Sequence, residues 1–153
     1  MIEPGTRAPD FALPDQDGNT VSLEQLRGET VLLVFYPLDF SPVCTDQLSV
    51  YQHALPELEA AGVRVYGVSV DSAFCHKAFQ AQLDISFPLL ADFNPKGELA
   101  RAVGVYSQAY GCSARALVLI GPDGIVRWSH RSQNALEIPS PSLVLEALAA
   151  PAA

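Results

Sequence analysis

The sequence feature that most constrains the fold is an uninterrupted apolar run, Val31–Tyr36, which is closed by Pro37. Strands that are buried on both faces have continuous apolar runs of this kind instead of an alternating pattern. Residues 41–61 have helical character and stop at Gly62, and Val63–Val70 is a second apolar run. A buried strand, a helix and another buried strand in this order predict a parallel β-α-β unit.

Segments on either side extend this unit into one domain. A hairpin is expected first, with short strands near residues 11–13 and 20–23 around a turn-forming stretch. The later elements are helices at about 71–83, 95–103 and 141–150, a short extended piece at 87–90, and a hairpin with strands at 116–120 and 125–130. We therefore expect a single thioredoxin-like α/β sandwich over residues 1–153, with a central mixed sheet, an N-terminal β-hairpin extension and flanking helices.

Charge and cysteine content exclude several functions. A formal charge of −8 on 153 residues argues against nucleic acid or an anionic membrane as a partner. No apolar stretch reaches the ~18 residues of a membrane span, and the first residues lack a signal-peptide pattern. A cytoplasmic protein is expected, in which Cys44, Cys75 and Cys112 are thiols and any disulfide is catalytic. The cysteines and histidines lack metal-ligand spacing, so neither a metal nor another cofactor is expected.

The segment best placed for chemistry is residues 37–44, which join the first buried strand to the long helix. In open α/β sheets, functional sites lie beyond the carboxyl ends of the strands. Cys44 falls in the first turn of the helix, where unpaired N–H groups and the helix dipole favour a thiolate. Such positions lower a cysteine pKa from about 8.5 to roughly 3.5–7.5, and the thiolate is the nucleophile. A thioredoxin-type disulfide reductase is disfavoured, because Gln47 stands where Cys-x-x-Cys requires its second cysteine.

A family resemblance rests on several separated matches. The segment Pro37-Leu38-Asp39-Phe40-Ser41-Pro42-Val43-Cys44 and Arg115 in Arg-Ala-Leu-Val-Leu-Ile-Gly-Pro-Asp-Gly occur in order, together with residues 8–13 and 87–92. The chain thus resembles the peroxiredoxin (AhpC/TSA) family, and within it the bacterioferritin comigratory protein and alkyl hydroperoxide reductase E type. The resemblance implies a thiol-dependent peroxidase that reduces hydrogen peroxide and organic hydroperoxides through a sulfenic acid at Cys44.

The resemblance also implies roles for the surrounding residues. Ser41 would hold the peroxide through its hydroxyl, and Arg115 would orient both sulfur and peroxide with its fixed fork of donors. Pro37 would shield the site from water, and Gln47 would help to position Arg115. Each residue also has a plainer interpretation on its own. Proline ends strands, serine caps helices, and an arginine at a strand start is often a surface residue.

The sulfenic acid must be recycled by a second thiol. Ser49 stands where one subgroup of the family has that cysteine, so this arrangement is absent. Cys75, placed roughly as in some other relatives, is the expected resolving residue, and its pairing with Cys44 requires the helix to unwind locally. Cys112 and an external thiol are the alternatives.

Four further expectations concern the reductant, the oligomeric state, a rival function and His76. The reductant is expected to be a thioredoxin-like protein or a small thiol, and the chain a monomer or a homodimer. A redox sensor or thiol-holding chaperone that does not turn over would look the same around Cys44. His76, which follows Cys75, is expected to be solvated, since adjacent helix residues point in different directions.

Overall fold

The apolar run at residues 31–36 forms β3 (Thr30–Phe35), the middle strand of a five-stranded sheet. The computed structural model describes residues 1–150; the remaining Pro151–Ala153 of the expected domain lie outside the described residues. The order of the sheet is β5-β4-β3-β8-β9. Its other strands are β4 (Val63–Ser69), β5 (Leu89–Ala91), β8 (Ala116–Ile120) and β9 (Val126–Arg131). β3, β4 and β5 run parallel, β8 is antiparallel to β3, and β9 is antiparallel to β8, which confirms the expected mixed sheet.

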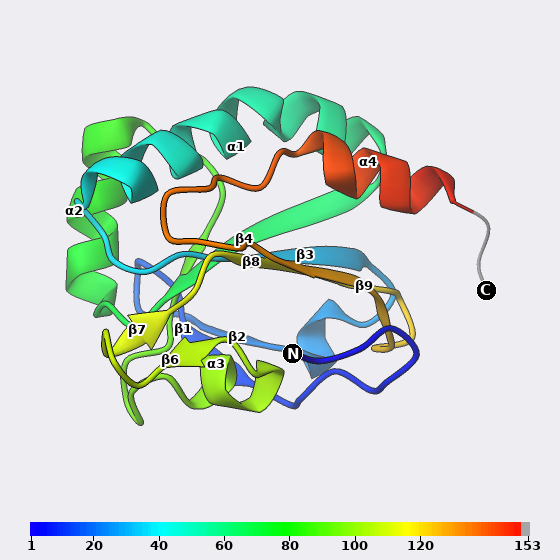
Figure 1. The fold of residues 1–153 in the computed structure, drawn as a ribbon, viewed down its shortest axis with the longest axis horizontal. Helices are drawn as coiled ribbons and strands as arrows, with labels where there is room; N and C mark the ends of the chain where they lie inside the picture. The colour runs from blue at the N-terminus through cyan, green and yellow to red at the C-terminus, as the bar shows by residue number, and fades with distance from the viewer. Residues whose placement is uncertain (151–153) are drawn as a thin grey trace.

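Helices and small hairpins cover the two faces of this sheet (Figure 1). One face carries α1 (Pro42–Ala60), α2 (Ala73–Leu83) and α4 (Ser142–Ala149). The other carries the β1–β2 hairpin (Ala12–Pro14, Thr20–Ser22), η1 (Glu24–Leu26), α3 (Glu98–Val103), and the β6–β7 hairpin (Tyr106–Ser107, Cys112–Ser113). In the described part of the chain, no helix is long and apolar enough to cross a bilayer.

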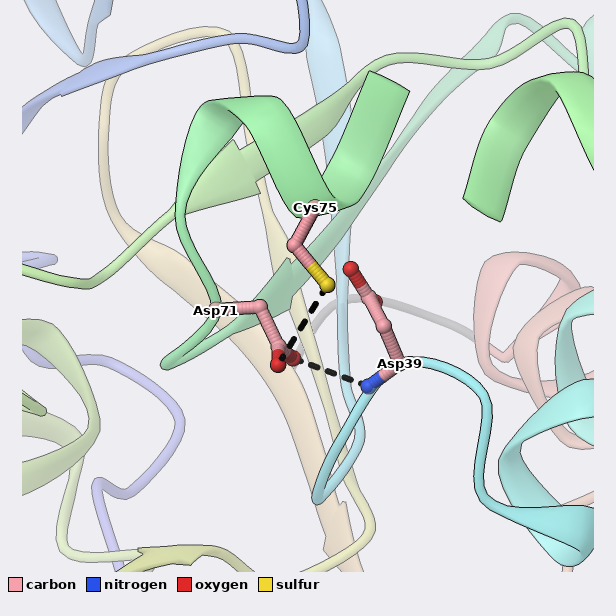
Figure 2. A group of neighbouring side chains, drawn as sticks. All are labelled: Asp39, Asp71 and Cys75. Atoms are coloured by element: carbon pink, nitrogen blue, oxygen red, sulfur yellow. Dashed lines mark hydrogen bonds between the residues drawn. The ribbon is translucent and has the colours of Figure 1, made fainter. Parts of the chain in front are cut away.

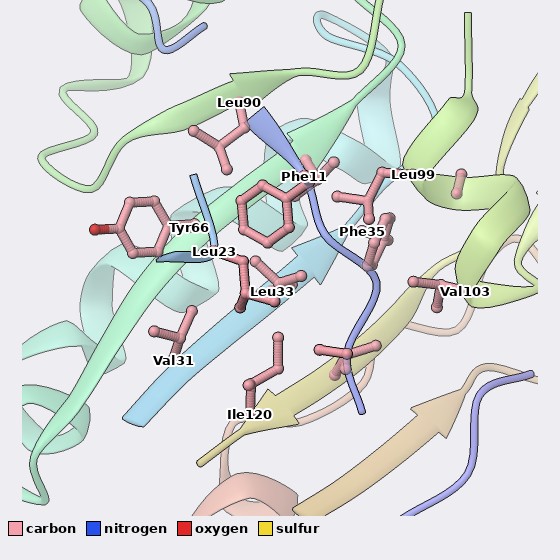
Figure 3. Packing of buried hydrophobic residues seen from close by; sticks show 14 of the residues in the cluster. Phe11, Leu23, Val31, Leu33, Phe35, Tyr66, Leu90, Leu99, Val103 and Ile120 are labelled. Atoms are coloured by element: carbon pink, nitrogen blue, oxygen red, sulfur yellow. The ribbon is translucent and has the colours of Figure 1, made fainter. Parts of the chain in front are cut away.

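β3 supplies side chains to both cores, which is why its sequence is apolar throughout. Val31, Leu33 and Phe35 pack with β1, η1 and α3 on one face (Figure 3). Leu32 and Val34 pack with α1, α2 and α4 on the other. All five side chains are at most 1% exposed. Because β3 is packed on both faces, the position of its last residue is fixed, and so is the start of the loop that leads to Cys44.

The ends of the helices follow from local chemistry. α1 begins with Pro42, whose fixed φ suits the first helical position, and ends just before Gly62, whose φ of +84° favours glycine. Ser72 caps α2, since its Oγ accepts a hydrogen bond from the Cys75 N–H at 3.2 Å. These two helices therefore start at defined residues next to the carboxyl ends of β3 and β4.

Two details differ from the sequence-based expectations. The third helix begins at Glu98 instead of residue 95, because residues 93–97 form turns and Gly97 takes a φ of +71°. The Asp92 carboxylate sets this start by accepting the N–H groups of Leu99 and Ala100, each at 2.9 Å. The β6–β7 hairpin and η1 were not expected, since strands of two residues and a single helical turn are too short for a periodic signal.

The double burial of β3 generates a stability prediction. Leu33→Ala is expected to lower the free energy of unfolding by about 2–5 kcal/mol, because it removes buried methyl groups and leaves a cavity. Urea denaturation of the purified protein measures this change. Leu136→Ala is the matched control: Leu136 is 76% exposed, so its truncation is expected to cost less than about 0.5 kcal/mol. Equal effects of the two substitutions would contradict the packing described here.

Candidate active site

Cys44 lies in the first turn of α1, just beyond the carboxyl end of β3, where the sequence pattern predicts the site. Its side chain is fully buried. Ser41 is the N-cap residue of this helix and has the extended backbone conformation of that position, and Pro42 is the first helical residue. The sulfur is therefore held among unpaired N–H groups at the start of a 19-residue helix.

Arg115 reaches this sulfur from the neighbouring strand. It precedes β8, whose Ala116 pairs with Phe35 at the end of β3. Its Nη1 donates to Cys44 Sγ at 3.2 Å and to Gln47 Oε1 at 2.7 Å. Its Nε donates to the Ala135 carbonyl oxygen at 2.7 Å. Three acceptors thus fix the guanidinium over the sulfur.

The charge of Arg115 sets the electrostatics of the site. Arg115 is only 5% exposed, and within residues 1–150 no carboxylate forms a salt bridge with it. A buried cation is costly unless an anion compensates it. Of the two side chains that accept hydrogen bonds from Arg115, Cys44 is the one that is able to carry a negative charge.

Gln47 completes this contact from the next turn of α1. Its side chain is fully buried, and Arg115 donates to its oxygen. Arginine has no acceptor, so this bond also fixes which end of the amide faces Arg115. The Gln47 Nε2 has no partner among the described residues, which leaves a free donor beside the guanidinium.

Ser41 and Pro37 lie in the adjoining loop, and within residues 1–150 neither forms a hydrogen bond with the sulfur. The Ser41 Oγ donates to the Leu38 carbonyl oxygen at 2.9 Å and makes no side-chain cap to α1. Pro37 is half-buried directly after Tyr36. The structure therefore brings Cys44, Arg115 and Gln47 into direct contact.

A buried polar network anchors this loop, and sequence reasoning missed it. The Asp39 carboxylate accepts from the Tyr36 hydroxyl at 2.6 Å and lies 2.7 Å from His76 Nδ1. His76 Nε2 lies 3.0 Å from the Leu90 carbonyl oxygen. Burial, followed by the negative charge of Asp39, raises the pKa of Tyr36 well above its usual value. These bonds tie the loop to α2 and β5, and they hold it although Phe40 has an unfavourable φ of 66°.

The expectation that His76 is solvated is wrong, because the side chain is fully buried. His76 and the buried Phe79 are three residues apart on α2, so they share the face that packs inward. The three-residue spacing between His76 and Phe79 was the signal in the sequence from which the burial of His76 could have been predicted. Its Nδ1 faces the Asp39 carboxylate, and its Nε2 faces the Leu90 carbonyl oxygen.

Cys75 occupies a different electrostatic environment (Figure 2). Its Sγ donates to Asp71 Oδ1 at 3.9 Å, and Asp71 Oδ2 accepts the Asp39 N–H at 2.9 Å. Burial, and then the carboxylates of Asp39 and Asp71, raise the pKa of Cys75 to about 12. The sulfur and the carboxylates lie within 4.8 Å of one another. Each carboxylate oxygen already accepts a hydrogen bond from the protein, so we interpret the group as a hydrogen-bond network.

The third cysteine, Cys112, is buried in β7. Burial raises its pKa, and the negative charge of Cys44 adds to this effect while Lys96 opposes it. Cys112 therefore lies within electrostatic range of Cys44. All three cysteines are free thiols in this structure.

Comparisons with known proteins agree with this geometry. A model of the AhpC/TSA family matches residues 4–129. Alkyl hydroperoxide reductase E of Mycobacterium tuberculosis is 36% identical over 151 residues, which cover 98% of each sequence. Chloroplastic peroxiredoxin Q of Triticum aestivum is 35% identical over 133 residues, 86% of this chain and 60% of the relative.

Solved structures show the same likeness. The crystal structure of Enterococcus faecalis AhpC matches with a TM-score of 0.87 and 30% identity, and the match covers 96% of this chain and 91% of that one. The expected thioredoxin-like architecture and the expected family are both confirmed. The chain therefore belongs to the AhpC/TSA family.

Proposed function

We propose that this chain is a thiol-dependent peroxidase in which Cys44 attacks hydrogen peroxide and organic hydroperoxides. The observation that carries the proposal is the 3.2 Å contact between the buried Arg115 guanidinium and the Cys44 sulfur. Family membership and relatives named as alkyl hydroperoxide reductase E and peroxiredoxin Q support it.

The chemistry follows from the charges in the site. The Cys44 thiolate attacks one peroxide oxygen, so that an S–O bond forms while the O–O bond breaks. The leaving oxygen takes a proton and departs as water or an alcohol, and Cys44 is left as a sulfenic acid. Arg115 stabilises the negative charge as it moves from sulfur to oxygen. Gln47 holds Arg115 in place. Pro37 and Ser41 line the approach in this proposal, with Ser41 exchanging its Leu38 partner for the peroxide.

Cys75 resolves the sulfenic acid in this proposal, and a thioredoxin-like protein or a small thiol then reduces the disulfide. Cys75 is held by the same loop that leads to Cys44, through Asp39 and Asp71. Cys112 and an external thiol are the competing resolvers. The proposal also includes a cytoplasmic location, in keeping with three free thiols, and a monomer or homodimer.

Substitution of the two charged partners tests the peroxidase step. Cys44→Ser is expected to abolish peroxide consumption, because it removes the thiol that contacts the Arg115 guanidinium. Arg115→Ala is expected to slow Cys44 oxidation by roughly 10²–10³-fold, the scale for loss of a transition-state donor. Stopped-flow measurement of peroxide loss gives both values. Arg64→Ala, at a half-exposed arginine, is the control and is expected to match the wild type. Undiminished activity in Cys44→Ser would refute the assignment.

Mass spectrometry after one equivalent of peroxide identifies the resolving thiol. The wild type is expected to form a Cys44–Cys75 disulfide, and Cys75→Ser to accumulate the sulfenic acid, since the proposed resolving thiol is lost. Cys112→Ser serves as the control and is expected to form the linkage as the wild type does. A linkage that persists in Cys75→Ser and disappears in Cys112→Ser would make Cys112 the resolver. Sulfenic acid in all three proteins would indicate an external thiol.

A further inference from the structure

We propose that Asp71 is the general base that takes the proton from Cys75 when the Cys44–Cys75 disulfide forms. This inference rests on the proposed function and adds a catalytic residue to it. Asp71 was not among the residues that the sequence pattern singled out.

The geometry that supports the inference is the double contact of one carboxylate. Asp71 Oδ1 accepts from the Cys75 sulfur at 3.9 Å, and Oδ2 accepts the Asp39 N–H at 2.9 Å (Figure 2). Asp71 follows β4 and precedes α2, so its position is fixed by a buried strand on one side and a capped helix on the other. One side chain thus holds both the resolving thiol and the loop before Cys44.

Resolution requires such a base because a thiolate is the attacking species. With its pKa raised to about 12 by burial and by Asp39 and Asp71, only about one Cys75 in 10⁵ is ionised at neutral pH. The same environment protects Cys75 from peroxide. Because Asp71 already accepts a hydrogen bond from the Cys75 thiol, it can take the proton during the attack, and Cys75 does not have to ionise beforehand.

The step balances without an external redox partner. The S–H bond of Cys75 breaks and its proton moves to the Asp71 carboxylate, while the sulfur electron pair attacks the Cys44 sulfur. The S–S bond forms as the S–O bond of the sulfenic acid breaks. The departing hydroxide takes a proton and leaves as water, and Asp71 regains its charge. One thiol and one sulfenic acid thus give one disulfide and one water.

The Asp39 contact couples this base to movement of the loop. A disulfide requires Cα atoms within about 7 Å, so the first turn of α1 must move toward Cys75. The Asp39 N–H that Asp71 Oδ2 accepts lies in the loop just before this turn, and the Ser69 Oγ donates to the same oxygen. Asp71 thus contacts both Cys75 and the loop that must move.

Asp71→Asn distinguishes a general base from a group that only raises the Cys75 pKa by its charge. For a general base, the rate of Cys75 alkylation and the rate of disulfide formation are expected to change in opposite directions. Loss of the negative charge lowers the Cys75 pKa, so alkylation of Cys75 by iodoacetamide is expected to accelerate in a Cys44→Ser/Cys112→Ser background. Formation of the disulfide is expected to slow by at least about tenfold, because general bases commonly contribute 10²–10⁴-fold. It is followed by quenched mass spectrometry after Cys44 has been fully oxidised by one equivalent of peroxide.

The controls use the same helix and the same functional group. Asp84→Asn changes an exposed aspartate at the other end of α2 and is expected to leave both rates unchanged. Asp71→Glu retains a carboxylate and is expected to recover part of the disulfide rate. The wild-type pH profile needs no variant: with a carboxylate base the disulfide rate is flat around neutrality, whereas attack by free thiolate would raise it about tenfold per pH unit.

Each contrary result has a distinct meaning. A disulfide rate that is equal or faster in Asp71→Asn, or a wild-type rate that climbs with pH, overturns the role of Asp71. A linkage that does not involve Cys75 also overturns it, while Cys44 continues to consume peroxide and the proposed function stands. Failure of the wild type to consume peroxide removes the proposed function itself.

Discussion

The contact between Arg115 and Cys44 is the interaction on which the rest of the site depends. The two residues are 71 positions apart in the chain, and they meet because β8 pairs antiparallel with β3 so that Ala116 lies opposite Phe35. A buried guanidinium needs an anion, and the sulfur at the start of α1 is in position to be one. The mixed sheet is therefore a precondition of the chemistry, since an all-parallel arrangement would not bring residue 115 to this edge.

Two thiols of one molecule are placed in opposite electrostatic environments. Cys44 contacts a cation, and Cys75 contacts the half-buried carboxylate of Asp71, which lies next to the buried Asp39. Peroxide reacts with thiolates, so the first environment promotes oxidation and the second suppresses it. The loop between β3 and α1 connects the two environments, because Asp39 bonds to Asp71 and His76. The proposed function therefore predicts that peroxide oxidises Cys44 in preference to Cys75.

Most of the sheet was predictable from the sequence, and much of the polar network was not. The run at residues 31–36 and the cap at Ser72 are local signals, and local signals set these elements in the structure. The motif around Cys44 also located the site loop. The burial of His76 and the bonds of Asp39 depend on how α2 packs against β5 and the loop, which no short spacing in the sequence records. The start of α3 was misjudged for a similar reason, since it depends on the Asp92 side chain.

The most direct test of the central claim compares folded and unfolded protein in a Cys75→Ser/Cys112→Ser variant, where Cys44 is the only thiol. The measurement is the second-order rate constant for Cys44 oxidation by hydrogen peroxide, with and without a denaturing concentration of urea. If the buried guanidinium activates the sulfur, the folded protein reacts at least about a hundredfold faster, because unfolding removes the donor. Equal rate constants in the two states would show that the fold does nothing to activate Cys44, and the proposed chemistry would fail.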